Sequence, residues 1–326
     1  MKNLNRRRLL RFAAGAAALP TVPRFASAQS YPSHPARIIV GTAAGGGIDI
    51  TARVIAQALT ERYSQQFFVE DRPGAGTNTG AELVIRSAAD GYTLFLTSAA
   101  NAINATLYEH LNFDFIRDMA PVATIARVPQ VLEVHPSVPA KTVPELIAYA
   151  KANPGKLNMA SAGSGSAQQV AGELFKMMAG INMVHVPYKG AGPALVDLLG
   201  GQVQVMFDTT PGSLEHIKAG QLRALAITTA TRSDVLPDLP PVGDFVPGYE
   251  ASQWYGISAP RGTPADVIDN LNKAVNASLA DAKTKARLAE LGGTPLAGSP
   301  ADFAKLLVDD TEKWGKVIKF SGARVE

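Results

Sequence analysis

The chain reads Arg37-Ile-Ile-Val-Gly-Thr-Ala-Ala-Gly-Gly-Gly47 directly ahead of an amphipathic stretch over Ile48–Ser64. The apolar run predicts a buried strand, the small residues a tight loop, and the amphipathic stretch a helix. A second stretch, Leu157-Asn-Met-Ala-Ser-Ala-Gly-Ser-Gly-Ser166, has the same order and leads into a predicted helix. We therefore expect one strand–loop–helix unit of this kind in each of two lobes.

Runs rich in Val and Ile alternate with amphipathic stretches of helical length along most of the chain. This alternation predicts βαβ units, and so an α/β fold with doubly wound parallel sheets. A proline-rich loop at Leu236–Gly248 precedes a predicted strand at Trp254–Ala259, where we expect the chain to return to the first lobe. The expected lobes are residues 31–127 plus 253–326 and residues 128–252, with a cleft between them.

The first 28 residues show the three regions of a cleaved export signal. Asn5–Arg11 contains consecutive arginines, Phe12–Leu19 is weakly apolar, and Ala26-Ser27-Ala28 is a small-x-small cleavage pattern. The arginine pair favours the twin-arginine route, which exports folded proteins. A membrane anchor is the alternative, but the apolar stretch is far shorter than the roughly 20 residues of a span. We expect cleavage after Ala28 and a periplasmic protein.

The positive charge of the chain is concentrated in this leading segment. The whole chain has 31 basic and 28 acidic residues, for a net charge of +3. Six of the bases and none of the acids lie in residues 1–28, which leaves 25 bases against 28 acids. A basic chain usually suggests nucleic-acid or anionic-membrane partners. Here the basicity belongs to the segment that we expect to be removed, so we expect no nucleic-acid partner.

No complete catalytic or cofactor motif is present. Gly41–Gly47 lacks the lysine of a P-loop, Gly74–Gly80 has one residue too many for a G-x-G-x-x-G loop, and Gly163–Gly165 is not a nucleophile elbow. The five histidines form no i,i+4 pair, and the chain has no cysteine, so a clustered metal site is not indicated. We therefore expect no cofactor, no metal and no catalytic residue. His185 is the least certain histidine, because it lies near Tyr188 at the expected edge of the cleft.

Several loops of small residues end where a predicted helix begins. A helix N-terminus has unpaired N–H groups and a partial positive charge, glycine allows close approach, and hydroxyls add hydrogen bonds. These features predict an anion site built without lysine or arginine. The candidate loop residues are Thr42, Gly46, Gly47, Thr97, Ser98, Ser161, Gly163, Ser164 and Ser166. Each loop could instead be an ordinary turn, and Ser166 could serve only as a helix N-cap.

Two aspartates and a tyrosine complete the candidate set. Asp49 lies in the first turn of its helix and can pair with Arg53 four residues later. Alternatively, Asp49 orients the glycine loop before it or accepts a hydrogen bond from a ligand, and both interpretations remain open. Asp208 ends a predicted strand, and the carboxyl ends of strands line the crevice of open α/β sheets. Tyr188 lies at the expected edge of the cleft.

Several ordered motifs match those of a known receptor family. They are Gly45-Gly-Gly-Ile-Asp-Ile-Thr-Ala-Arg53, Val69-Glu-Asp-Arg-Pro-Gly-Ala-Gly76, His185-Val-Pro-Tyr-Lys-Gly190, Gly200-Gly-Gln-Val203, Met206-Phe-Asp208 and Ala259-Pro-Arg-Gly-Thr-Pro264. With these motifs the chain resembles the Bug-type receptors of tripartite tricarboxylate transporters, over nearly all of its length after the export signal.

The resemblance implies a type II periplasmic-binding-protein fold whose two lobes close on a small carboxylate. Backbone amides, hydroxyls and bridging waters hold the ligand in that family, from loops that match Gly45–Asp49, Thr97–Ala99 and Ser161–Ser166, and its strand-end aspartate matches Asp208. The chain departs from the family pattern at several places in or beside these loops. Asp71 replaces the usual asparagine, Thr77 stands where glycine is common, and Gln168-Gln169 replace the usual histidine.

We therefore expect a monomeric periplasmic receptor that captures a di- or tricarboxylate or an aromatic carboxylate by hinge closure. Its partners would be the membrane permease subunits of a tripartite transporter, or a sensor of a two-component system. A periplasmic enzyme that acts on a small carboxylate is the main rival, because a fold does not determine function. A nucleotide-binding domain is disfavoured by the spacing of the glycines.

Overall fold

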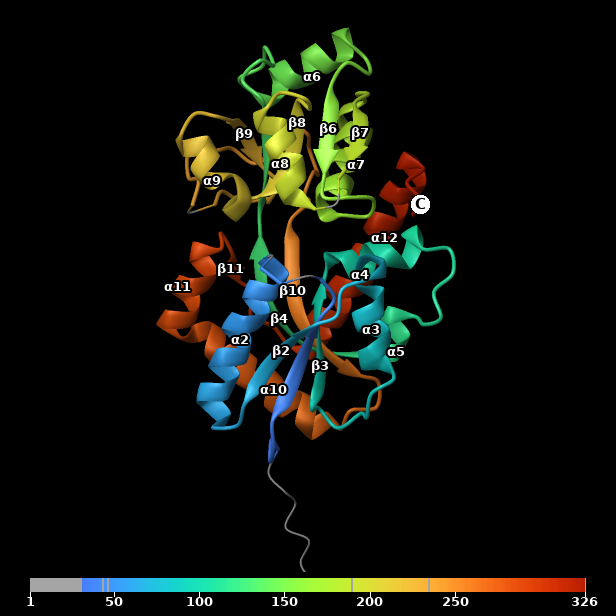
Figure 1. The fold of residues 1–326 in the computed structure, drawn as a ribbon, viewed down its shortest axis with the longest axis vertical. Helices are drawn as coiled ribbons and strands as arrows, with labels where there is room; N and C mark the ends of the chain where they lie inside the picture. Colours follow the sequence, from blue (N-terminus) through green and yellow to red (C-terminus); the bar gives the residue numbers. More distant parts are fainter. Residues whose placement is uncertain (1–30, 43, 46, 189, 234, 326) are drawn as a thin grey trace, which may run out of the picture. The chain divides into compact units, whose positions relative to one another are not determined.

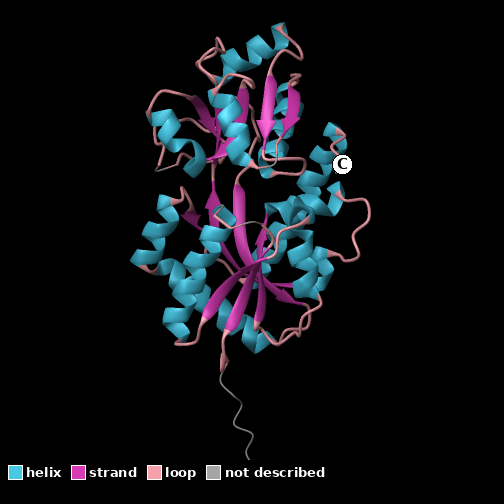
Figure 2. Cartoon of the chain, viewed as in Figure 1, coloured by secondary structure: helices cyan, strands magenta, loops and turns pink. Residues whose placement is uncertain are grey.

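A computed structural model describes residues 31–325 except residues 43, 46, 189 and 234. The predicted export signal at residues 1–28 and the candidate Gly46 lie outside the described residues. Residues 34–326 belong to one compact unit. The unit contains two β-sheets with helices packed around each (Figures 1 and 2). We call the elements around the six-stranded sheet lobe one and those around the five-stranded sheet lobe two.

The sheet of lobe one has the strand order β11-β4-β10-β3-β1-β2. Its strands are β1 (Ala36–Val40), β2 (Phe67–Asp71), β3 (Thr93–Ser98), β4 (Met119–Val128), β10 (Gln253–Pro260) and β11 (Thr294–Pro295). Strand β1 is parallel to β2 and β3, whereas β10 is antiparallel to both β3 and β4. The sheet is therefore mixed rather than purely parallel as expected. The reason is topological: β10 re-enters at the end of the sheet where β4 leaves it.

The sheet of lobe two has the order β7-β6-β8-β5-β9. Its strands are β5 (Gln130–Val134), β6 (Asn158–Ser161), β7 (Val184–Pro187), β8 (Val205–Thr209) and β9 (Arg223–Ile227). Strand β6 is parallel to β7 and β8, and β5 is antiparallel to β8 and β9. This sheet is also mixed, because β5 enters it from lobe one in the direction opposite to that of the βαβ units.

Helices pack on both sheets. Those of lobe one are α2 (Gly47–Tyr63), α3 (Asn78–Ile85), α4 (Ala99–Leu107), α5 (Phe115–Asp118), α10 (Ala265–Ala280), α11 (Ala282–Glu290) and α12 (Pro300–Ser321), and those of lobe two are α6 (Val143–Ala152), α7 (Ala167–Ala179), α8 (Ala191–Leu199) and α9 (Thr210–Lys218). In α2, Ala52, Ile55, Ala56 and Leu59 are buried, and this i, i+3, i+4, i+7 spacing places them on one face of the helix. No helix in the described part of the chain has the length and apolarity of a membrane span.

Two crossings join the lobes. The first is short, because Pro129 alone separates β4 from β5. The second runs from β9 through residues 228–252 to β10. Proline cannot donate to a strand ladder, so Pro129 separates two strands that belong to different sheets. Figure 1 shows β4 and β10 side by side between the helices of lobe one, and they pair along most of their lengths.

Candidate functional site

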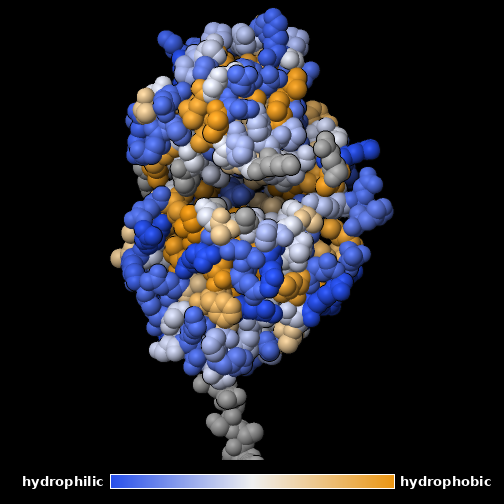
Figure 3. Space-filling view, in the orientation of Figure 1, coloured by the Kyte–Doolittle hydropathy of each residue, from blue (hydrophilic) through white to orange (hydrophobic). Residues whose placement is uncertain are grey.

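A hollow lies between the two lobes on the face seen in Figure 3, and hydrophilic residues lie inside it. The loops that carry most of the predicted site residues follow β1, β3, β6 and β8, at the carboxyl ends of these strands. The same ends lead into α2, α4, α7 and α9. The fold therefore presents several helix N-termini, which favour anions, at the strand ends predicted to line a crevice.

Asp49 holds the loop that precedes α2. Its Oδ2 accepts a hydrogen bond of 2.7 Å from the backbone N–H of Gly45, and its Oδ1 lies 2.7 Å from Nε of Arg53. The carboxylate is therefore both paired with Arg53 and placed to orient the loop, and its contact with a ligand stays a prediction. Arg53 Nη2 reaches Asp71 Oδ2 at 3.0 Å. Burial and the nearby Asp49 carboxylate raise the pKa of Asp71, although Arg53 opposes this shift.

Two side chains lie close to the same loop. Gly47 approaches Tyr255 of β10, since a Cβ added to the glycine would lie 3.3 Å from the tyrosine hydroxyl. Tyr255 is fully buried, and burial raises its pKa to about 12. Thr42 Oγ1 is buried and has no hydrogen-bond partner among the described residues. An unpaired buried hydroxyl is energetically costly.

The two predicted site residues at the end of β3 differ in which of their groups already form hydrogen bonds. The hydroxyl of Thr97 lies 2.7 Å from that of Ser258 on β10, and Thr97 is completely buried. The Thr97 hydroxyl therefore already has a hydrogen-bond partner within the sheet. The backbone N–H of Ser98 donates to Asn101 Oδ1 at 2.9 Å, which ties the first turn of α4 to the loop. Ser98 itself is 1% exposed.

Three asparagines that the sequence reasoning missed tie the loops of lobe one together. Asn101 Nδ2 donates to Thr77 Oγ1 at 3.0 Å, and Asn104 Nδ2 donates to the Gly76 carbonyl at 2.6 Å and to Asn78 Oδ1 at 3.0 Å. Nδ2 of Asn78 is buried without a partner among the described residues. Asparagine is favoured near helix N-termini, and this preference could have identified Asn78 and Asn101. The loop before α3 and helix α4 therefore form one polar cluster.

In lobe two, a chain of hydrogen bonds fixes the loop between β6 and α7. The backbone N–H of Gly165 donates to Gln169 Oε1 at 2.6 Å, so the amide Nε2 of Gln169 faces His185 Nδ1 at 3.2 Å. An amide nitrogen only donates, so Nδ1 must accept and the proton of the neutral ring lies on Nε2. Nε2 is 2.6 Å from Ser161 Oγ, which then accepts its hydrogen bond. Gln169 thus ties the β6–α7 loop to His185.

The surroundings of His185 favour the neutral form of its ring. Burial, with a smaller contribution from Lys176, lowers the pKa of His185 to about 4. The ring is therefore neutral near neutral pH. Because its Nε2 donates, the ring does not act as a base toward Ser161. The serine is fully buried and its hydroxyl is left to donate to the Gly163 carbonyl at 3.2 Å.

The remaining candidates in lobe two differ in their accessibility. Ser166 accepts from the backbone N–H of Gln169 at 3.2 Å and caps α7, as the simpler interpretation expected. Ser164 is exposed. Gly163 has φ 130° and lies against Tyr188, whose carbonyl oxygen would be 3.0 Å from an added Cβ. The hydroxyl of Tyr188 donates to Asp197 Oδ2 at 2.7 Å and so is directed toward α8.

Asp208 lies at the end of β8, as predicted, and is 1% exposed. Its Oδ2 accepts from Ser213 Oγ at 3.1 Å, while Oδ1 has no hydrogen-bond partner among the described residues. Burial raises the pKa of Asp208, and the Thr209 backbone, Ser213 and the Gln168 amide oppose this shift. Gln168 thus contributes to the surroundings of this carboxylate.

The lobes touch beside the candidate loops. A Cβ added to Gly165 of lobe two would overlap the side chain of Leu107 at the end of α4. On another part of the boundary, a Cβ added to Gly292 would lie 2.9 Å from Thr210 Cβ. The contact of Gly165 brings the β6–α7 loop against α4 and Asn104 of lobe one.

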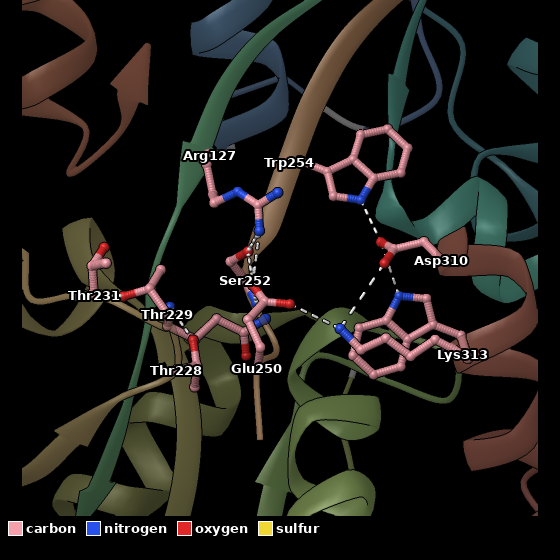
Figure 4. A network of polar contacts seen from close by, with 11 residues as sticks. Arg127, Thr228, Thr229, Thr231, Glu250, Ser252, Trp254, Asp310 and Lys313 are labelled. Atoms are coloured by element: carbon pink, nitrogen blue, oxygen red, sulfur yellow. Dashed lines mark hydrogen bonds and ion pairs between the residues drawn. The ribbon is translucent and has the colours of Figure 1, made fainter. Parts of the chain in front are cut away.

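A polar network surrounds the return crossing (Figure 4). Oε1 of Glu250 accepts from Arg127 Nη1 at 2.9 Å, and Oε2 accepts from Lys313 Nζ at 2.9 Å. Asp310 accepts from the indole nitrogen of Trp254 at 2.5 Å and from that of Trp314 at 3.2 Å. Burial alone would raise the pKa of Glu250, but Lys313, Ser252 and Arg127 together hold it below its ordinary value. The network therefore holds the crossing against β4 and α12.

One cavity lies beside the asparagines of lobe one, and another lies beside Arg127 of the polar network. One of about 360 Å³ is bounded by Asn78, Asn101 and Tyr108 and extends toward α5. The other, of about 290 Å³, lies between Arg127 and the loop after β9. No group of three or more potential metal ligands occurs within the described ranges.

The comparisons with known proteins agree with this arrangement. Residues 51–323 match the family model of the tripartite tricarboxylate transporter family receptor. The chain belongs to this family. Protein BugT of Bordetella pertussis is 36% identical over 92% of this chain and 93% of its own. The solved structure of R. palustris Rpa4515 with adipate is 38% identical, with a TM-score of 0.82 over 90% of this chain and all of that one. MatC of Rhodopseudomonas palustris with bound malate is 29% identical, with a TM-score of 0.77 over 88% of this chain and 100% of that one.

Proposed function

We propose that this chain is the extracytoplasmic receptor of a tripartite transporter and that it captures a small dicarboxylate between its lobes. Its family consists of such receptors, and two structural relatives carry adipate and malate. The observation that supports this most directly is the set of polar atoms that are buried without partners beside the helix N-termini. Thr42 Oγ1, Asn78 Nδ2 and Asp208 Oδ1 belong to this set. A carboxylate ligand, with its bridging waters, would supply the missing partners.

We propose that the ligand contacts the chain mainly through backbone groups of the loops at Gly45–Asp49, Thr97–Ser98 and Ser161–Ser166. The side chains of Thr97, Ser161 and Tyr188 already have partners, so these residues would act through backbone groups and pocket shape. Thr42, Gly46, Gly47 and Asp208 complete the proposed set.

We further propose lobe boundaries at residues 31–127 plus 253–326 and 128–252. The twin-arginine signal cleaved after Ala28, a monomeric state and the permease subunits as partners also belong to this proposal. The two crossings at Pro129 and at residues 228–252 would be the hinge about which the lobes close on the ligand.

A hydrolytic enzyme is the alternative function, because Ser161 Oγ lies 2.6 Å from His185 Nε2. In a serine nucleophile the hydroxyl donates to a basic ring nitrogen. Here Gln169 places the ring proton on the nitrogen that faces the serine. This geometry favours a receptor that makes and breaks no bond.

A melting-temperature panel tests the proposal. Adipate, malate, citrate and benzoate are compared with sugars and amino acids of similar size, and at least one carboxylate should raise the melting temperature. Mass spectrometry should then recover that carboxylate unchanged after prolonged incubation. A shift with sugars alone would reject the carboxylate assignment, and consumption of the ligand would reject the receptor.

A further inference from the structure

Glu133 is an acid buried inside lobe two, where the proposed ligand contacts do not reach. It is completely buried on β5, and its neighbours across the sheet are Met206 and Ala224. Its Oε1 lies 2.7 Å from Ser213 Oγ, and its Oε2 has no hydrogen-bond partner among the described residues. A buried carboxylate with a single donor is strongly disfavoured relative to the neutral acid. Burial and the nearby Asp208 accordingly raise the pKa of Glu133 well above its ordinary value.

Ser213 connects Glu133 to the end of β8. Its Oγ lies within hydrogen-bond distance of both Glu133 Oε1 and Asp208 Oδ2, at 2.7 and 3.1 Å. A hydroxyl has one proton and donates to only one of these oxygens. A protonated acid that donates to the serine would satisfy the second contact without repulsion between two unprotonated oxygens. This geometry therefore favours a proton on one of the two acids.

Asp208 is the better place for the negative charge. The Thr209 backbone, Ser213 and the Gln168 amide all favour its ionised form, whereas only Ser213 does so for Glu133. The hydrogen bonds consequently run from Glu133 Oε1–H to Ser213 Oγ, and from Ser213 Oγ–H to Asp208 Oδ2. The proton rests on the inner acid, and the charge rests at the carboxyl end of β8.

The other titratable groups on the elements packed against this pair make contacts elsewhere. They are Glu173 with Lys176 on α7, Asp197 of α8 with Tyr188, Glu215 with Lys218 on α9, His216 with Gln221, and Arg223 of β9 with the carbonyls of Val138 and Ala140. Within the described part of the chain, no basic side chain forms an ion pair with Glu133 or Asp208. The nearest group that can neutralise the charge of Asp208 is therefore the proton of Glu133, which lies one hydroxyl away.

We propose that Glu133 and Asp208 share one proton, and that this proton moves through Ser213 to Asp208 when a ligand carboxylate binds beside it. The Glu133 O–H bond breaks as its proton passes to Ser213, and the proton of Ser213 passes to Asp208 Oδ2. Glu133 becomes the carboxylate, Asp208 becomes neutral, and the total charge is unchanged. The inference rests on the proposed function, because it requires a carboxylate in the cleft.

The transfer would define the class of ligand that the site accepts. With the charge on Asp208, Oδ1 accepts a hydrogen bond from a ligand hydroxyl. With the charge moved inward to Glu133, the same position tolerates a second carboxylate, because repulsion between like charges falls with distance. The receptor could thus bind plain and hydroxylated dicarboxylates without taking up a proton from solvent.

Calorimetric titration with adipate, in buffers of different ionisation enthalpy, tests the transfer. The unsubstituted protein should take up no proton on binding and should keep a constant affinity between about pH 6 and pH 8. Glu133→Gln keeps the size of the side chain but has no proton to give. Its binding should take up about one proton, and its affinity should fall by up to about tenfold per pH unit.

Glu215→Gln is the matched control, because Glu215 is an exposed acid on α9. It should bind adipate with unchanged affinity and no proton uptake. Wild-type affinity without proton uptake in Glu133→Gln would overturn the proposal. Uptake of a proton by the unsubstituted protein would also overturn it, since the pair would then lack a proton to share.

Infrared spectroscopy of the ligand-free protein gives a readout that does not depend on binding. The unsubstituted protein should show the carbonyl stretch of a protonated acid near neutral pH, and Glu133→Gln should lose it. If the band is absent from the unsubstituted protein, both acids are ionised and the proposal fails. If the band is present but no carboxylate binds, the proposed function and the transfer on binding both fail, while the shared proton stands.

Discussion

Lys313 Nζ lies 2.9 Å from Glu250 Oε2, so the last helix of the chain holds the segment that returns from lobe two to lobe one. Arg127 binds the other oxygen of the same carboxylate from β4. One partly buried acid therefore connects both strands of the crossing to α12.

Substitution of Lys313 by Met should lower the free energy of unfolding by about 1–2 kcal/mol, because a partly buried charge-assisted hydrogen bond is lost. Chemical denaturation of the purified protein measures this change. Lys316→Met is the control, since Lys316 pairs with Glu312 on the exposed side of the same helix and should change the stability by less than about 1 kcal/mol. Equal losses in the two variants would contradict a special role for Lys313.

The same carboxylate should make stability depend on pH. The pKa of Glu250 is lower in the folded protein than its ordinary value, so its stabilising effect is complete above about pH 4.3. The effect is lost as the pH falls through the lower, folded pKa. Glu250→Gln should be less stable than the parent at neutral pH, and the difference should shrink in acid. Denaturant midpoints measured over this range test the sign.

Asp49→Ala should weaken carboxylate binding by at least about tenfold, because Gly45 loses the acceptor that orients its backbone N–H. Asp49→Asn should bind better than the alanine variant, since its amide oxygen can still accept from Gly45. Calorimetric affinities and melting temperatures measured together separate binding from folding. If the alanine variant keeps full affinity at an unchanged melting temperature, the loop does not depend on Asp49.

His185 should titrate in acid, with a pKa of about 4 in the folded protein. Since this is below the unfolded value of about 6.5, stability should decline by up to about 1.4 kcal/mol per unit as the pH falls between the two values. Gln169→Glu should raise the pKa of His185, because a carboxylate in place of the amide favours the charged ring. Nitrogen chemical shifts of the ring measure the pKa and the tautomer. A parent spectrum with the proton on Nδ1 would contradict the hydrogen-bond chain.

Gly165→Ala should weaken ligand binding more than it destabilises the fold, because the added methyl group overlaps Leu107 across the lobe boundary. Gly180→Ala is a close control: both glycines have positive φ, of 78° and 63°, but nothing lies within 4 Å of a Cβ at Gly180. The two variants should share a backbone cost of about 1 kcal/mol. Only Gly165→Ala should lose affinity, and adding Leu107→Ala should restore part of it. Equal affinities in the two glycine variants would argue against closure at this contact.

The sequence predicted those features that depend on neighbouring residues. The pair Asp49–Arg53 follows from helical spacing, and the cap at Ser166 follows from the start of an apolar periodic stretch. The start of helix α4 at Ala99 is harder to predict, because the small residues after Ser98 resemble a loop. Local patterns thus located most elements but not every boundary.

Contacts between distant positions were beyond the reach of such patterns. Thr97 was predicted as a site residue from its loop, but nothing in that loop indicates that the hydroxyl of Ser258, 161 positions later, lies 2.7 Å from its own. The antiparallel direction of β10 depends on the return of the chain from lobe two. Likewise, the relation of Glu133 to Ser213 spans 80 positions, and nothing local to either residue indicates it.

The position of β10 has a consequence for how the protein is made. This strand lies between β3 and β4, yet the ribosome delivers it only after all of lobe two. Until then the emerging chain exposes two unpaired strand edges, which are prone to pair with other chains. Lobe two can complete its own sheet first, whereas lobe one must wait for residues 253–260. A nascent chain stopped before this strand should therefore depend on chaperones that shield strand edges.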